Sequence, residues 1–214
     1  MKNTMKLVLL FLLSGYAGAL HAQSKDDMTD TRRKNETIIK IAQKDIRSEM
    51  ASFTMAGIDE SVGKGDIHKI PFSEVGSNFM TFEGDGMKAT VSTATFEPSK
   101  HKLDYDEKYL IKIDKKTYYG GYGAIPKNYI NKVSMIMGKD TIAIPATAYS
   151  DLYNLNFSYL NTGVQKSTNG IYRSKDGHRT YLYIFCKDNT GSYEVTWIFI
   201  DKVYYRRVLD YGFM

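Results

Sequence analysis

Residues 193–200 read Tyr-Glu-Val-Thr-Trp-Ile-Phe-Ile, and this stretch decides the fold. In an extended strand, alternate side chains point to opposite faces of a sheet. Both faces of this strand are mostly apolar: one holds Val195, Trp197 and Phe199, and the other holds Thr196, Ile198 and Ile200. Such a pattern is typical of a strand that is buried on both sides. We therefore expect a central strand here, with another layer of structure on each face.

Three strand-like runs surround this stretch, at residues 171–175, 179–185 and 203–209. The connections are short and rich in turn residues: Asp176-Gly177, Asp188-Asn189-Thr190-Gly191 and Asp201-Lys202. Loops this short join antiparallel neighbours. The sequence therefore predicts a four-strand meander at the C-terminal end.

Earlier in the chain, residues 78–83 and 87–96 alternate on either side of Gly84-Asp85-Gly86, which predicts a hairpin because both turn residues must tolerate positive φ. Further strands are expected at 109–113, 133–137 and 141–144, a short helix at 148–155, mostly loop at 57–77 and an ordered loop at 118–127, while 97–108 is a polar stretch that contains Pro98.

Residues 33–53 carry apolar side chains at steps of three and four, namely Ile38, Ala42, Ile46, Met50 and Phe53. This spacing predicts one amphipathic helix whose apolar stripe packs on a sheet. The expected fold class is α+β. It is a mostly antiparallel twisted sheet or partial barrel with the C-terminal four-strand meander, packed against one N-terminal amphipathic helix.

The first 22 residues have the three-part build of a secretory signal peptide. Lys2 and Lys6 form a positive head, residues 7–13 are an apolar run too short to cross a bilayer, and small residues follow. Cleavage is expected after Ala22, with Ala19 as the competing position, and the leader resembles those of exported proteins of Gram-negative bacteria. We expect a periplasmic or secreted protein without an integral membrane segment after cleavage.

Behind the leader, residues 23–32 are polar and are expected to form a disordered N-terminal segment, and residues 33–214 a single globular domain. The only cysteine, Cys186, cannot close an intramolecular disulfide, and its apolar neighbours favour a buried thiol.

The formal net charge of +5 is spread along the chain, whereas a nucleic-acid surface needs a concentrated basic stripe. We therefore expect no nucleic-acid partner.

The sequence contains no recognisable metal, cofactor or nucleophile motif. His68, His101 and His178 are scattered and lack zinc-ligand spacing, and no Gly-x-Ser-x-Gly elbow occurs. No catalytic residue, metal site or cofactor is therefore expected. Paired carboxylates are the enzymatic alternative, although the candidates lie beside turns, where Asp and Gly also serve the backbone: Glu83, Asp85, Asp104 and Asp106.

The chain holds 17 tyrosines, and three of them stand in the glycine-rich loop at 118–127. Tyrosine combines a large apolar ring with a hydroxyl, which suits both sheet edges and binding surfaces. Tyr118, Tyr119, Tyr122 and Lys127 are therefore the predicted ligand-binding residues.

These patterns favour a non-catalytic exported protein of the cell envelope that binds a polysaccharide, peptide or protein partner through an aromatic surface. The alternative is a periplasmic hydrolase of cell-wall or carbohydrate substrates, with Asp104 and Asp106 as the first pair to test. A third hypothesis is an assembly component that pairs through a sheet edge. The oligomeric state and the role of Arg206 and Arg207 stay open.

Overall fold

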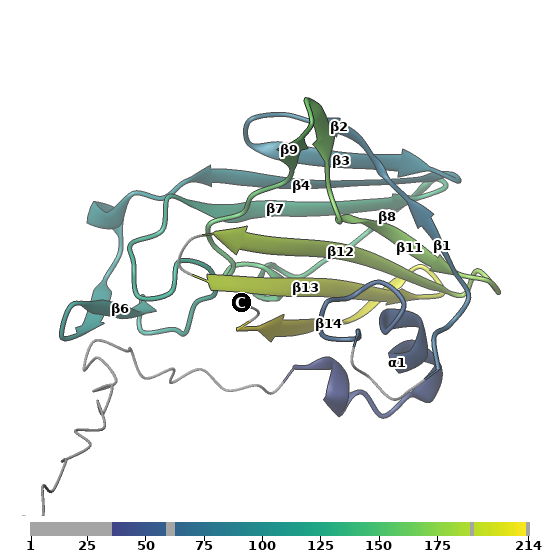
Figure 1. The fold of residues 1–214 in the computed structure, drawn as a ribbon, viewed down its shortest axis with the longest axis horizontal. Coiled ribbons are helices and arrows are strands. Elements are labelled where there is room, and N and C mark those ends of the chain that lie inside the picture. Colours follow the sequence, from purple (N-terminus) through teal and green to yellow (C-terminus); the bar gives the residue numbers. More distant parts are fainter. Residues whose placement is uncertain (1–35, 59–62, 189–190, 213–214) are drawn as a thin grey trace, which may run out of the picture.

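Figure 1 shows the computed structural model of the chain, which describes residues 36–58, 63–188 and 191–212. The predicted signal peptide (1–22) and the predicted disordered segment (23–32) lie outside the described residues. The helical elements are η1 (Ile38–Lys40), α1 (Lys44–Met50), η2 (Pro98–Lys100) and η3 (Ala146–Ala148), where η denotes a 3₁₀ turn. The strands are β1 (Ile67–Ile70), β2 (Phe72–Val75), β3 (Phe79–Gly84), β4 (Met87–Thr95), β5 (Leu103–Asp106), β6 (Tyr109–Ile113), β7 (Asn128–Met137), β8 (Asp140–Ile142), β9 (Tyr159–Asn161), β10 (Val164–Lys166), β11 (Gly170–Ser174), β12 (Arg179–Asp188), β13 (Gly191–Ile200) and β14 (Val203–Tyr211).

Two five-stranded sheets make up most of the structure, and two small hairpins, β5-β6 and β9-β10, accompany them. The first sheet has the order β1-β11-β12-β13-β14, and the second has the order β2-β3-β4-β7-β8. Phe82 and Met135 from the second sheet share one buried core with Leu182 and Trp197 from the first, so the two sheets pack face to face. The predicted α+β fold with antiparallel sheets and a C-terminal meander is confirmed.

Strand β13 is central, as predicted. It pairs with β12 along its full length and with β14 on its other side. Trp197 faces the second sheet and donates its Nε1–H to the carbonyl of Ala148 at 2.9 Å. Ile198 faces the other way and packs with Ile46 and Met50 of the N-terminal segment. Both faces of β13 are therefore buried. One lies under the second sheet, and the other lies under residues 38–56, which contain η1 and α1 and which we call the helical cover.

The helix of this cover, α1, is shorter than the helix predicted over 33–53. Over the described part of 33–53, α1 begins only at Lys44, and Ile38–Lys40 is a single 3₁₀ turn. The backbone here is held by β14: the Ile38 N–H donates to Asp210 at 2.9 Å, and the Leu209 N–H donates to the Glu36 carbonyl at 2.7 Å. These hydrogen bonds use backbone groups that a longer helix would need, so the periodicity is correct but the helical extent is not.

Two further predictions, the loop over 57–77 and the helix over 148–155, were wrong. Residues 67–75, expected to be loop, form β1 and β2 on either side of Pro71, and these strands pair with β11 and β3 respectively. Residues 148–155, expected to be helical, are mostly non-helical after η3. Their backbone bonds to neighbouring segments instead, with the Tyr119 N–H donating to the Asp151 carbonyl at 2.9 Å and the Ile130 N–H to the Leu152 carbonyl at 2.9 Å.

The polar stretch at 97–108 contains β5, which pairs with β6. The β3-β4 hairpin is confirmed, and its turn residues Asp85 and Gly86 have φ values of 50° and 70°. Positive φ at both positions matches the twist of the flanking strands, which is the reason for the Asp-Gly pair.

Ile198→Ala should lower the free energy of unfolding by about 2–5 kcal/mol, because it leaves a cavity between the first sheet and the helical cover. Ile39→Ala is the matched control, since Ile39 is 67% exposed, and should change it by less than about 0.5 kcal/mol. Urea unfolding followed by tryptophan fluorescence measures both. Equal effects of the two substitutions would show that the cover does not pack as described.

Candidate functional site

A cavity of about 380 Å³ is lined by residues next to β6. Figure 1 shows β6 at one end of the molecule. We call the cavity the tyrosine pocket, and its principal lining residues are His101, Asp114, Tyr118, Tyr129, Tyr149, Asp151 and Tyr153. They come from the residues around the β5-β6 hairpin, the glycine-rich loop, the start of β7 and the segment after η3. The pocket therefore exists only because the sheet topology brings separate segments to the same end of the molecule.

Aromatic rings form its wall. The Phe96 ring stacks on His101 with centroids 4.6 Å apart, and Tyr153 meets Phe96 and Tyr118 edge to face at 5.5 and 5.7 Å. Such offset and edge-to-face pairs add to the stabilisation from burial alone. The wall is therefore a packed aromatic cluster, with Tyr129 as its half-buried member.

His101 and Asp114 form the most sharply defined polar pair of the pocket. The His101 Nδ1 lies 2.7 Å from one Asp114 oxygen, and the Lys102 backbone N–H donates to the other at 2.8 Å. The hydrogen bond with His101, and then that with Lys102, hold the pKa of Asp114 below its usual value. An ionised carboxylate only accepts, so Nδ1 of His101 is the donor in this hydrogen bond.

Tyr153 provides a hydroxyl that stays protonated. Burial, followed by the negative charges of Asp114 and Asp151, raises the pKa of Tyr153 to about 12. The neighbouring Asp151 carboxylate is bound by the Arg207 guanidinium through two contacts of 2.5 and 2.7 Å. These contacts fix the segment after η3 against β14, and Arg207 also donates to Glu36 of the N-terminal segment at 2.6 Å.

Of the four residues predicted from sequence, Tyr118 lines this pocket. Its hydroxyl lies within hydrogen-bond distance of the carbonyls of Leu110 and Gly121, at 3.0 and 2.9 Å, and so holds the glycine-rich loop against β6. Tyr119 is buried in the main core, where its ring lies 5.4 Å from that of Tyr211. Tyr122 is half-buried and Lys127 is exposed, and neither lines the tyrosine pocket.

The carboxylates considered for hydrolysis lie elsewhere. Asp104 and Asp106 do not line the tyrosine pocket, and Asp104 lies 3.8 Å from Lys102. Glu83 pairs with Lys88 at 2.8 Å, and Asp85 pairs with His68 at 3.1 Å. Across the described ranges, no three His, Cys, Asp or Glu side chains gather in a way that could hold a metal ion.

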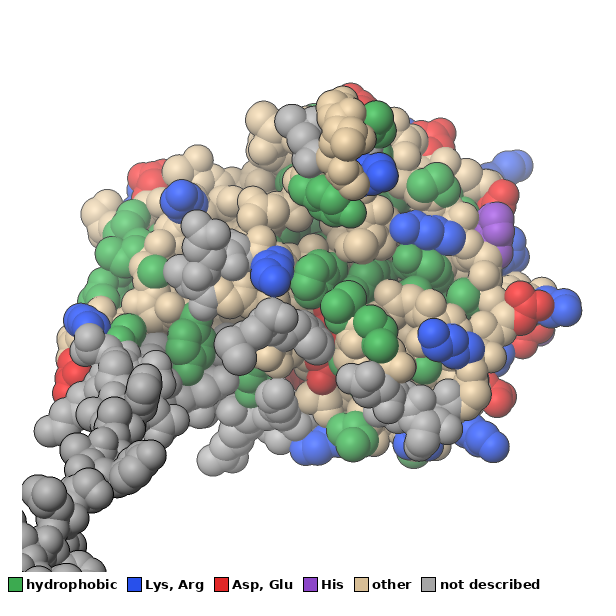
Figure 2. All heavy atoms as spheres, in the orientation of Figure 1, with side chains coloured by type: hydrophobic (Ala, Val, Ile, Leu, Met, Phe, Trp, Pro, Cys, Tyr) green, Lys and Arg blue, Asp and Glu red, His purple; other side chains and the backbone are tan. Residues whose placement is uncertain are grey.

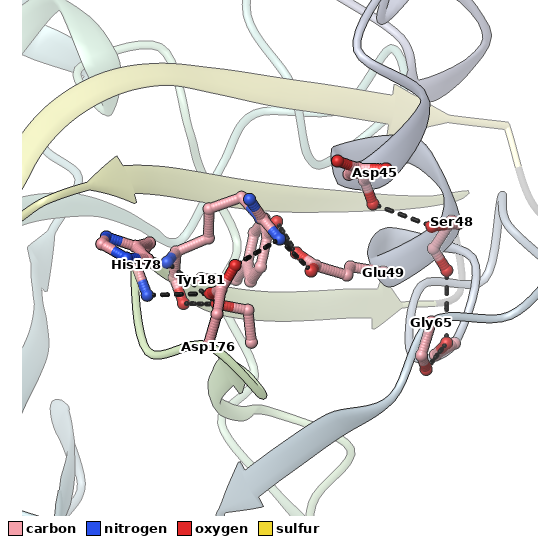
Figure 3. Close-up of polar contacts among 10 residues, drawn as sticks. Asp45, Ser48, Glu49, Gly65, Asp176, His178 and Tyr181 are labelled. Atoms are coloured by element: carbon pink, nitrogen blue, oxygen red, sulfur yellow. Dashed lines mark hydrogen bonds and ion pairs between the residues drawn. The ribbon is translucent and has the colours of Figure 1, made fainter.

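A second polar network holds the helical cover on the first sheet (Figure 3). Glu49 of α1 accepts two hydrogen bonds from Arg179 at 2.9 and 2.7 Å and one from the Tyr181 hydroxyl. Asp176, in the turn before β12, also contacts Arg179 at 3.1 Å. Burial, and then the bond to Glu49, raise the pKa of Tyr181, so its hydroxyl stays a donor. This network fixes α1 to β12 of the first sheet.

Glu194 makes the equivalent contacts at the other end of the cover. Its carboxylate accepts the backbone N–H groups of Met55 and Ala56 at 2.7 and 2.8 Å and the Tyr183 hydroxyl at 2.6 Å. Burial raises the pKa of Glu194.

The expected buried position of Cys186 is also confirmed, and its Sγ donates to the Asn154 carbonyl at 2.8 Å.

Comparison of the chain with models of known protein families, with curated proteins and with solved structures finds no match. Within the part of the chain that the structure describes, no helix has both the length and the apolar character needed to cross a membrane. The functional argument therefore depends on the geometry of the pocket itself.

His101→Asn should raise the pKa of Asp114 toward 3.8, its ordinary value, because it removes the main hydrogen bond that favours the ionised form. NMR titration of the Asp114 side-chain carboxyl measures this, with His68→Asn as a control that should leave it unchanged. An Asp114 pKa that does not change in His101→Asn would contradict the pairing.

Glu49→Ala should lower the free energy of unfolding by about 3 kcal/mol, because it leaves the buried Tyr181 hydroxyl without its acceptor and the Arg179 guanidinium with Asp176 as its remaining carboxylate partner. Glu83→Ala removes a carboxylate of the same kind whose side chain is 58% exposed, and should cost about 1 kcal/mol or less. Chemical denaturation compares the two variants, and similar losses would argue against a structural role for Glu49.

Proposed function

We propose that this protein is an exported, non-catalytic component of the cell envelope that binds a glycan in the tyrosine pocket. The single observation that carries the proposal is the convergence of tyrosine rings with the His101–Asp114 pair around one cavity of about 380 Å³. Ligand pockets are typically concave and largely apolar, with a few fixed polar groups that orient the ligand.

The chemistry of the lining suits a sugar ring. Half-buried Tyr129 and Tyr149 offer apolar ring surface, while the Asp114 carboxylate can accept hydrogen bonds from hydroxyl groups. The Tyr153 hydroxyl stays a donor because its pKa is raised to about 12. A neutral hydroxylated ring can use all three kinds of contact at once, which favours a glycan over a peptide or protein partner.

The hydrolase alternative has weaker support in the geometry. A glycosidase needs one carboxyl group that stays protonated and one that is ionised. The two carboxylates that line the pocket are both engaged, Asp114 by His101 and Asp151 by Arg207. The pKa of Asp114 is lowered, which is opposite to what a general acid requires. We therefore favour binding without turnover.

Export rests on the leader alone. The leader predicts a periplasmic or secreted location, and an envelope glycan is a ligand that such a protein would meet. Fractionation of the producing cells, with detection of the processed chain, tests this part of the proposal separately from binding.

Tyr149→Ala should weaken glycan binding about tenfold or more, because it removes one aromatic wall of the pocket. Tyr159→Ala is the control: Tyr159 is 54% exposed on β9 and does not line the pocket, so affinity should be unchanged. A glycan array with the purified protein selects the ligand, and titration calorimetry measures its affinity for each variant.

Ser150→Trp is a second variant for the same test, because Ser150 is an exposed residue of the lining and a large ring there should block the cavity. Affinity retained in both Tyr149→Ala and Ser150→Trp would overturn the pocket assignment. Release of sugar fragments during the titration would instead support the hydrolase alternative.

A further inference from the structure

A second cavity, of about 480 Å³, lies at the opposite end of the molecule from the tyrosine pocket. Strand β7 joins the two: Tyr129, near its start, lines the tyrosine pocket, and Met137, at its end, lines this one. At about 3.3 Å per residue the two positions are roughly 26 Å apart. We call the second cavity the turn pocket, because hairpin turns of both sheets surround it.

The floor of the turn pocket is apolar and closed. Met87 and Met137 are cross-strand partners on β4 and β7 and are 6% and 4% exposed. Thr180 of the first sheet lies beside them, with its hydroxyl 4.0 Å from the Met87 sulfur. This floor lies where the ends of the two sheets meet, and it can accommodate an apolar group.

The rim is charged, and Figure 2 shows acidic, basic and histidine side chains crowded at the end of the molecule where these turns lie. Most of the rim charges are paired within the protein. Asp85 pairs with His68 at 3.1 Å, His178 with Asp201 at 2.6 Å, and Lys202 with Asp140 at 3.0 Å. These pairs hold the turns in place and leave one rim cation to account for.

That cation is Arg173. Among the residues that the structure describes, the Arg173 guanidinium has no carboxylate partner. By contrast, Arg179 on β12 and Arg207 on β14 each contact two acidic side chains. Arg173 lies against Gly177, where a side-chain carbon added to the glycine would come within 2.9 Å of one guanidinium nitrogen. Gly177 has a φ of 75°, a backbone conformation that favours glycine. Because glycine has no side chain, the backbone of the turn can lie directly against the guanidinium.

We propose that the turn pocket binds a small carboxylate ligand with an apolar body, with Arg173 holding the carboxylate and Met87 and Met137 contacting the apolar part. A planar guanidinium matches a carboxylate through two parallel hydrogen bonds. The His178 ring stands on the same rim and adds positive charge when protonated, which its bond to Asp201 favours by raising the pKa of His178. This site is separate from the proposed glycan site and does not depend on it.

The test uses N-acetyl-leucine, which carries a carboxylate beside an apolar side chain, and measures binding to the purified protein by calorimetry. N-acetyl-leucinamide lacks the charge, and inorganic phosphate lacks the apolar body. We expect N-acetyl-leucine to bind, and the amide and phosphate to bind at least tenfold more weakly. Equal binding of N-acetyl-leucine and its amide, or of N-acetyl-leucine and phosphate, would overturn the assignment, as would no binding of N-acetyl-leucine at all.

Arg173→Gln should reduce the affinity for N-acetyl-leucine about tenfold or more, because hydrogen bonds to a charged group are lost. Arg206→Gln is the matched control, since Arg206 is half-buried on β14 and does not line the turn pocket. His178→Gln alters an exposed rim residue and should also weaken binding, which keeps the test decisive if Arg173→Gln does not fold. Full affinity in both Arg173→Gln and His178→Gln would contradict the proposal.

Discussion

The structure depends on one constraint, which is that strand β13 has to be buried on both faces. Trp197 on one face needs the second sheet, and Ile198 on the other needs the helical cover. Each of these two layers also buries polar groups, and these groups need hydrogen-bond partners. Glu194 and Glu49 supply them for the helical cover by accepting backbone N–H, tyrosine hydroxyl and arginine donors. Buried carboxylates are tolerated here because each has several donors.

With both faces of the first sheet buried, the two candidate pockets lie at the ends of the sheets. Side chains of a strand must alternate between the two faces of the sheet, whereas side chains of loops need not. Loop side chains from different segments can therefore point toward one another at the end of a sheet. The tyrosine pocket and the turn pocket occupy opposite ends, and they differ in chemistry. One is walled by aromatic rings around His101 and Asp114, and the other has a methionine floor below Arg173. A single framework thus presents two surfaces of distinct character.

Local patterns in the sequence were enough to predict the C-terminal meander and the β3-β4 hairpin, because alternation and turn residues are read within a few positions. They could not give the extent of α1, since hydrogen bonds to Asp210 and Leu209 on β14 determine where the helix can begin. Pro71 separates β1 from β2, and each of these strands has 4 residues, which is too short to show a clear period.

The same limit applies to the candidate site. Tyr118 was predicted from its glycine-rich loop, and the structure places it in a pocket. The other lining residues are scattered over more than fifty positions of sequence and share no motif: His101, Asp114, Tyr129, Tyr149 and Tyr153. The β5-β6 hairpin brings His101 to Asp114, and the pairing of β4 with β7 and the backbone contacts of the segment after η3 bring in the tyrosines. The last two are not encoded in local spacing. The abundance of tyrosine was the one available signal.

The most direct test of the account is an NMR titration of the isotopically labelled protein with soluble fragments of envelope glycan, recording the amide shift of every assigned residue. We predict that shifts change around His101, Tyr129 and Ser150 and leave the β9-β10 hairpin and the helical cover unaffected. Saturable shifts that map to the helical cover or to β9-β10, with the tyrosine pocket unchanged, would contradict it.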